Sequence, residues 1–120
     1  MISVNVKFIG KDVESIEVSG HALFADYGKD IVCAGVSAVV IGGFNALEKY
    51  INDKSVELYE NKSKLAIKVL KTNETIQTII STILVQLQTI ESSYQENIKI
   101  TIKRGGVWNV IKVKFTILRI

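Results

Sequence analysis

The fold is decided first by residues 31–51, IVCAGVSAVVIGGFNALEKYI, which directly follow Asp30. This stretch is too long for a strand and rich in Ala, Val and Gly, so it predicts a buried helix with Asp30 as its N-cap. Gly35, Gly42 and Gly43 each weaken a helix by about 1 kcal/mol relative to Ala. We expect them to be tolerated because another element packs closely against this helix.

A second helix is predicted after Thr72 or Asn73, either of which is a suitable N-cap. Apolar side chains then recur every three or four residues, which is the pattern of an amphipathic helix. They are Ile76, Ile79, Ile80, Ile83, Leu84, Leu87 and Ile90. The opposite face is expected to be polar and solvated, and it consists of Gln77, Ser81, Gln88 and Glu91.

Segments that alternate between apolar and polar residues surround both helices and predict strands. They are residues 2–9, 13–19, 56–59, 65–70 and 97–103. The predicted order is therefore ββα-ββα-β. Repeated ββα units favour an α/β (α+β) two-layer sandwich, with one mixed or antiparallel sheet and two helices packed on it.

Length and composition exclude several classes of protein. A chain of 120 residues is one domain, and we assign residues 1–104 to it and residues 105–120 to a basic apolar tail or an extra strand. The single Cys excludes an intrachain disulfide, and one Cys with one His cannot form a usual structural metal site. No metal or cofactor is predicted.

Two further observations bear on where the protein works. No apolar run reaches about 18 residues, so no transmembrane helix and no membrane partner are predicted. Residues 1–10 lack the pattern of a signal peptide. With a single Cys, the expected location is the reducing cytoplasm.

The charge of the chain is unevenly placed. Residues 1–96 carry a net charge of −3, whereas residues 97–120 contain six basic side chains and no acidic one. The mildly acidic body argues against a general nucleic-acid binder. Residues 107–120 are apolar and basic, and they are open to three interpretations: an extra strand or unfolded tail, an arm that touches RNA weakly, or a frame-shifted end.

The single Cys and the single His carry the candidate chemistry. Cys33 is predicted in the first turn of the capped helix, where unpaired N–H groups and the helix dipole stabilise a thiolate. His21 follows the second strand and can supply acid–base catalysis. The helix N–H groups can also hold an acyl oxyanion. Residue types alone leave a buried, inert Cys33 and a simple loop His21 open.

Residues 19–22, SGHA, and residues 26–37, DYGKDIVCAGVS, closely resemble the motifs of the bacterial ribosomal-processing cysteine protease family, Prp. The family pattern is Gly-His-Ala, a short loop, and then Gly-x-Asp-Ile-Val-Cys-Ala-Ala-Val-Ser. The predicted element order agrees through about residue 103. Gly35 stands where the family usually has Ala, and the tail after Arg104 is longer and more basic than the family leads us to expect.

The resemblance implies a cysteine endopeptidase, acting as a homodimer without a cofactor. Its substrate would be the N-terminal extension of the large-subunit ribosomal protein number twenty-seven, cleaved after a pair of Phe residues. His21 would be the base and Cys33 the nucleophile. Gly20, Asp30 and Ser37 match further motif positions.

The loop that joins the two catalytic positions has two interpretations. Leu23, Phe24 and Tyr27 line or cover an apolar substrate pocket, with Gly20 and Gly28 as hinges, or they only pack the loop down. Two other functions also stay open: a non-catalytic ribosome-associated binding module with an inert Cys, and a thiol redox sensor. The reactivity of Cys33 discriminates among them.

Overall fold

The computed structural model describes residues 1–20 and 31–105, and every structural statement below concerns those residues. They form five strands and two helices in the predicted order. The elements are β1 (Ile2–Ile9), β2 (Asp12–Ser19), α1 (Ile31–Tyr50), β3 (Val56–Glu60), β4 (Lys64–Val69), α2 (Glu74–Ser93) and β5 (Ile98–Gly105).

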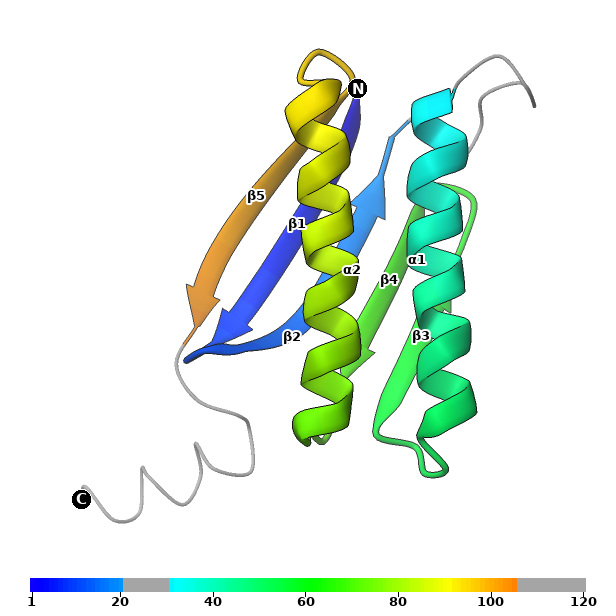
Figure 1. Ribbon diagram of the computed structural model, residues 1–120, viewed down its shortest axis with the longest axis vertical. Helices are drawn as coiled ribbons and strands as arrows, with labels where there is room; N and C mark the ends of the chain where they lie inside the picture. Colours follow the sequence, from blue (N-terminus) through cyan, green and yellow to red (C-terminus); the bar gives the residue numbers. More distant parts are fainter. Residues whose placement is uncertain (21–30, 106–120) are drawn as a thin grey trace.

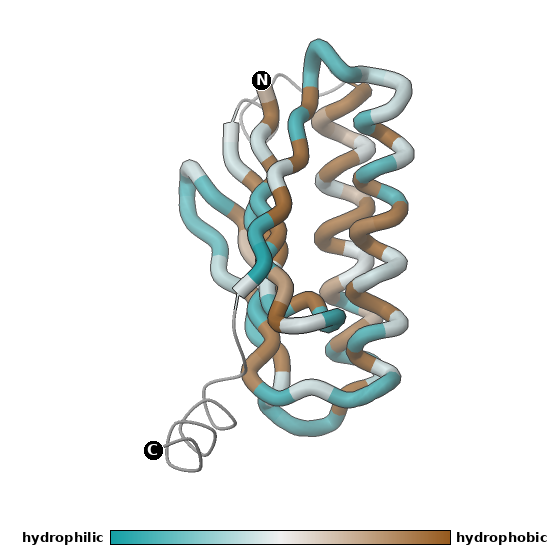
Figure 2. The backbone as a smooth tube through the Cα atoms, turned by 90° about the vertical axis from the view of Figure 1, so that its left-hand side faces the viewer, coloured by the Kyte–Doolittle hydropathy of each residue, from teal (hydrophilic) through white to brown (hydrophobic). Residues whose placement is uncertain are grey.

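The strands form one mixed sheet in the order β3-β4-β2-β1-β5. The two hairpins and the β2–β4 pair are antiparallel, whereas β5 returns beside β1 and runs parallel to it. Both helices lie on one face of this sheet, and no described helix or strand covers the other face (Figures 1 and 2). The prediction of a two-layer α+β sandwich with one sheet and two helices is confirmed.

The core lies between the sheet and the helices. Alternation along β1 sends Val4 and Val6 inward, and both are essentially unexposed. The predicted apolar stripe of α2 faces them: five of its members are buried, and Ile79 and Ile90 are partly buried at its margins. The amphipathic pattern therefore located this packing surface correctly.

The two helices approach each other closely at one glycine. A Cβ atom placed on Gly43 would collide with the Ile83 side chain of α2, and one placed on Gly35 would lie 3.6 Å from Ile90 Cδ1. Close packing therefore explains Gly43, as expected. It does not explain Gly35, where a Cβ atom would make an ordinary van der Waals contact, or Gly42, where a Cβ atom meets nothing within 4 Å.

α1 is long and apolar enough to cross a membrane when length and composition alone are considered. By that criterion the expectation that no segment qualifies is wrong. Core helices meet the same criterion, and α1 buries Val36, Val40 and Leu47 against the sheet. Its apolar character thus has an explanation in the packing of the domain.

Two polar residues of α2 were predicted to be solvated, and the structure corrects both. Gln77 is half-buried: its Oε1 accepts from Val13 N–H at 2.8 Å, and its Nε2 donates to Val13 O at 2.9 Å. It thus satisfies the backbone of β2 where the β1–β2 register shifts. Glu91 is half-buried as well, and it accepts from Ile100 N–H of β5. Helical periodicity marked both as outward because it carries no information about backbone groups of other elements.

Boundaries differ from the prediction only slightly. The cap of α2 is Asn73, whose Oδ1 accepts from Ile76 N–H at 2.9 Å. β5 continues to Gly105, two residues beyond the predicted end. Of the proposed tail, residues 105–120, Gly105 belongs to β5; residues 106–120 lie outside the described residues, so their interpretation as a tail or an extra strand stays a prediction.

Candidate active site

The described elements on either side of the predicted loop, β2 and α1, meet at one end of the sandwich. β2 ends at Ser19, beside the start of β1, and α1 begins at Ile31 at that same end of the molecule (Figure 1). The segment that joins them, residues 21–30, lies outside the described residues. The ends of β2 and α1 therefore flank the place where the two parts of the motif meet.

The backbone conformation at position 20 requires a glycine. Its φ is +109°, a value that L side chains rarely adopt. A Cβ atom on it would also collide with the Met1 carbonyl oxygen and lie 3.2 Å from Ile2 Cα. Gly20 therefore sets the direction in which the chain leaves β2, immediately before His21. The sequence motif identified Gly20 as a site residue. Its close contact with the Met1 carbonyl oxygen follows only from the pairing of β1 with β2.

Cys33 is the third residue of α1 and lies within its first turn. Its side chain is 6% exposed and belongs to the core cluster between the helices and the sheet. The first turn of α1 contains no acidic residue. The N–H groups at the start of a helix are not used by its own carbonyls, so this end favours a thiolate or an oxyanion. The predicted placement of Cys33 at the start of a helix is therefore confirmed.

Ser37 follows Cys33 by one helical turn, so both side chains lie on the same side of α1. Ser37 is half-buried. The structure thus places Ser37 next to Cys33 along the helix.

The remaining predicted site residues lie outside the described residues. They are the predicted base His21, the predicted cap Asp30, and the predicted substrate-loop residues Leu23, Phe24, Tyr27 and Gly28. Their roles stay predictions.

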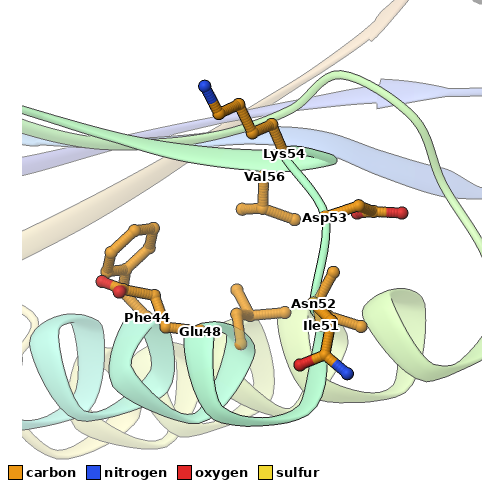
Figure 3. A pocket seen from close by; sticks show the side chains of 8 residues that line it. Phe44, Glu48, Ile51, Asn52, Asp53, Lys54 and Val56 are labelled. Atoms are coloured by element: carbon orange, nitrogen blue, oxygen red, sulfur yellow. The ribbon is translucent and has the colours of Figure 1, made fainter.

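A pocket lies at the opposite end of α1 from Cys33, with a volume of about 520 Å³. Phe44, Ile51 and Val56 turn their apolar side chains into it, while Lys54 and Asp53 extend away (Figure 3). Its lining contains no Cys or His. The pocket is therefore separate from Cys33.

Acidic and metal-ligating side chains do not cluster in the described part of the chain. No group of three or more His, Cys, Asp or Glu is close enough there to hold a metal ion.

Known proteins resemble this chain in both sequence and fold. The family model described as "Cysteine protease Prp" matches residues 1–99. The ribosomal processing cysteine protease Prp of Staphylococcus aureus (strain Mu50) is 38% identical over 104 residues, which cover 85% of this chain and 97% of the relative. The Bacillus subtilis (strain 168) protein of the same name is 35% identical over 100 residues, covering 76% and 87%.

Solved structures agree with these relatives. The S. aureus ribosomal processing protease Prp in complex with a substrate peptide is 36% identical and matches with a TM-score of 0.75, covering 86% of this chain and all of that one. The same enzyme with a covalently linked product peptide matches with a TM-score of 0.77 at the same identity and coverage.

Sequence, fold and the helix-start cysteine together define the class as cysteine proteases. Within that class, the chain belongs to the Prp family. The resemblance found in residues 19–37 is thereby confirmed over most of the chain.

Proposed function

We propose that this chain is a ribosomal-processing endopeptidase in which Cys33 is the nucleophile and His21 the general base. The observation that carries the proposal is the position of Cys33 in the first turn of α1, at the end of the sandwich where Gly20 directs the chain into His21. The relatives named for ribosomal processing support the class of substrate.

The first half of the reaction is acyl transfer. The Cys33 thiolate attacks the carbonyl carbon of the scissile peptide bond, and the carbonyl oxygen becomes an oxyanion. N–H groups at the start of α1 are suited to stabilise that charge. When the C–N bond breaks, the His21 imidazolium donates its proton to the leaving amine, and the acyl group remains on Sγ as a thioester.

The second half of the reaction releases the acyl group. Neutral His21 takes a proton from a water molecule, whose oxygen attacks the thioester carbonyl. The C–S bond then breaks, the peptide leaves as a carboxylic acid, and the imidazolium beside the Cys33 thiolate is restored. Atoms and protons balance without a metal or a cofactor.

The substrate we propose is the N-terminal extension of the large-subunit ribosomal protein number twenty-seven, cleaved after a pair of Phe residues. Leu23, Phe24 and Tyr27 would form the apolar surface for that pair, with Gly28 as a hinge. Asp30 would cap α1 and thereby hold Cys33 in place. Ser37 would support the same site from one turn along the helix.

We also propose that the enzyme works in the cytoplasm as a homodimer whose contact surface is the outer face of α1. From Ile31 to Leu47 the helix carries no charged residue, and Ile31 and Ile41 are 68% and 42% exposed. A second copy presents the same uncharged surface, so two such faces meet without burying a charge. This surface begins two residues before Cys33.

The central experiment measures hydrolysis of a synthetic peptide that contains the Phe pair. Cys33→Ser is expected to abolish turnover while leaving the melting temperature nearly unchanged, because the size change is small. His21→Gln is expected to reduce turnover by about two to four orders of magnitude. Turnover near the wild-type rate in Cys33→Ser would overturn the assignment.

A labelling experiment separates the alternatives. Because Cys33 is the only cysteine, the rate of alkylation by iodoacetamide reports on that thiol alone. A protease is expected to react rapidly at neutral pH and to lose activity in proportion to labelling. An unreactive thiol would indicate the binding module, and reversible oxidation without peptide hydrolysis would indicate the redox sensor.

A further inference from the structure

On the half of the outer sheet face that β1 and β5 form, the outward positions from Ser3 to Lys7 and from Lys99 to Lys103 are all polar. In the parallel register of these strands, three pairs of outward side chains stand side by side, and all six are exposed. The pairs are Ser3 with Lys99, Asn5 with Thr101, and Lys7 with Lys103. We call these six residues the β1–β5 polar face. None of them is acidic or aromatic.

A lysine elsewhere on the sheet, Lys64 of β4, has an acidic partner. Lys64 Nζ lies 3.1 Å from Glu17 Oε1, so both charges of that pair are compensated. In the described ladder, by contrast, Lys99 lies beside Ser3, and Lys103 lies beside another lysine, Lys7. Like charges side by side destabilise a sheet. Sheet stability therefore does not explain the positive charge of this face.

The ion pair between Lys7 and Glu14 reduces the positive charge of this face but does not remove it. Its Nζ lies 3.2 Å from Glu14 Oε1, yet its side chain is still 53% exposed, whereas that of Glu14 is 12% exposed. The lysine thus presents its charge to solvent, and the acid is largely covered. An approaching polyanion meets the three ammonium groups rather than the carboxylate.

We propose that the β1–β5 polar face binds the sugar–phosphate backbone of double-stranded RNA. Lysine ammonium groups together with hydroxyl and amide donors are the side chains that contact phosphates and sugars. Lys99 and Lys103 are four residues apart, which is about 13 Å along a strand. Single-stranded RNA is held largely by stacking on aromatic rings, and this face has none. The β1–β5 polar face therefore suits the backbone of a duplex, which proteins recognise by its charge and shape.

The choice of RNA over other polyanions rests on the proposed function, because a substrate that is a ribosomal protein is met next to ribosomal RNA. The acidic balance of residues 1–96 confines attraction to the segment that begins with β5. The face lies on the side of the sheet away from the helix layer that holds Cys33 (Figure 2). RNA binding and peptide hydrolysis are therefore separable.

The test is fluorescence anisotropy of the full chain with a labelled RNA hairpin of about 20 base pairs, over a series of salt concentrations. Three phosphate contacts predict an affinity that falls about 40-fold between about 50 and 200 mM salt. The double variant Lys99→Glu/Lys103→Glu is expected to weaken binding by at least about tenfold. Hydrolysis of the free peptide by that variant is expected to stay unchanged.

Matched variants control for charge. Lys54→Glu/Lys62→Glu makes the same change in net charge at exposed positions near β3 and is expected to alter affinity by less than about twofold. Equal losses in both double variants would overturn the proposal. So would full loss of binding on neutralising Lys112, Lys114 and Arg119, or stronger binding to phosphatidylserine vesicles than to the hairpin. If peptide hydrolysis fails while RNA binding follows this pattern, the proposed function falls and the RNA-binding face stands.

Discussion

α1 and α2 are each twenty residues long and pack on the same face of the sheet, yet their outer surfaces differ. The solvent side of α2 consists largely of Thr, Ser and Gln, and Val85 is its exposed large apolar residue. The solvent side of α1 is uncharged over four turns and exposes two isoleucines. A surface helix normally has one apolar stripe. α2 thus has a single packing surface, whereas α1 is apolar on two sides.

The starts of the two helices differ as well. α2 begins with the Asn73 side chain bound to its own backbone and has Glu74 in its first turn. The first turn of α1 has no acid and contains Cys33 instead. Among the described residues, α2 therefore supplies its own start with Asn73 and Glu74, whereas the first turn of α1 presents Cys33. A positive helix end stabilises an anion, so the start of α1 is where the proposed thiolate is expected.

The largest expected effect comes from the contact between the helices. Gly43→Ala places a methyl group into the packed Ile83 side chain, and overpacking of a core costs about 1–3 kcal/mol. Gly42→Ala, its neighbour, meets open space and should stabilise α1 by about 0.5–1 kcal/mol. Urea unfolding of both variants measures the change in the free energy of unfolding. Equal shifts in the same direction would show that α1 and α2 do not approach as described.

The next effect concerns the polar link between α2 and the sheet. Gln77→Ala removes both hydrogen bonds to the backbone of Val13 and one to Thr72 Oγ1, so we expect a loss of about 1–3 kcal/mol. Gln88→Ala, on the exposed side of the same helix, should change stability by less than about 0.5 kcal/mol. The melting temperatures of the Gln77→Ala and Gln88→Ala variants measure this difference. A silent Gln77 variant would restore the original interpretation of this residue as solvated.

A smaller effect is expected on self-association. Ile41→Lys introduces a charge into the outer face of α1 and should weaken a dimer by about tenfold, which corresponds to about 1.4 kcal/mol. Val85→Lys makes the same change on α2 and should leave association unchanged. Light scattering over a dilution series of each variant provides the measurement. If Val85→Lys weakens the dimer instead, α2 rather than α1 forms the contact.

The smallest effect belongs to the loop after α1. A hydrogen bond from the Ser55 side chain is the main cause that lowers the pKa of Asp53 below 3.8, with the Ser55 N–H and Lys71 contributing. A lowered folded pKa stabilises above the unfolded pKa, and that contribution disappears as pH falls through the folded value. Asp53→Asn should therefore be slightly less stable than wild type at about pH 7, and the difference should shrink as the pH falls through the folded pKa of Asp53. A difference that persists in acid would contradict this.

Much of the fold could be predicted because its signals are local. Alternation predicted β1 within its observed ends, and the stripe from Ile76 to Ile90 predicted the packing face of α2. Gln77 and Glu91 were misjudged because their partners, the backbones of Val13 and Ile100, come from distant strands. No periodicity within one helix contains that information.

The candidate site divides in the same way. The sequence by itself determined the helix start at Cys33, the preceding Gly-His pair and the family they indicate, because these depend on neighbours along the chain. Only the tertiary structure decided that Gly20 lies against Met1, that β5 runs parallel to β1, and that Lys103 therefore stands beside Lys7. Strand order depends on which elements bury their apolar faces together. That choice is made by the free energy of the whole packed domain, which no single segment of the sequence specifies.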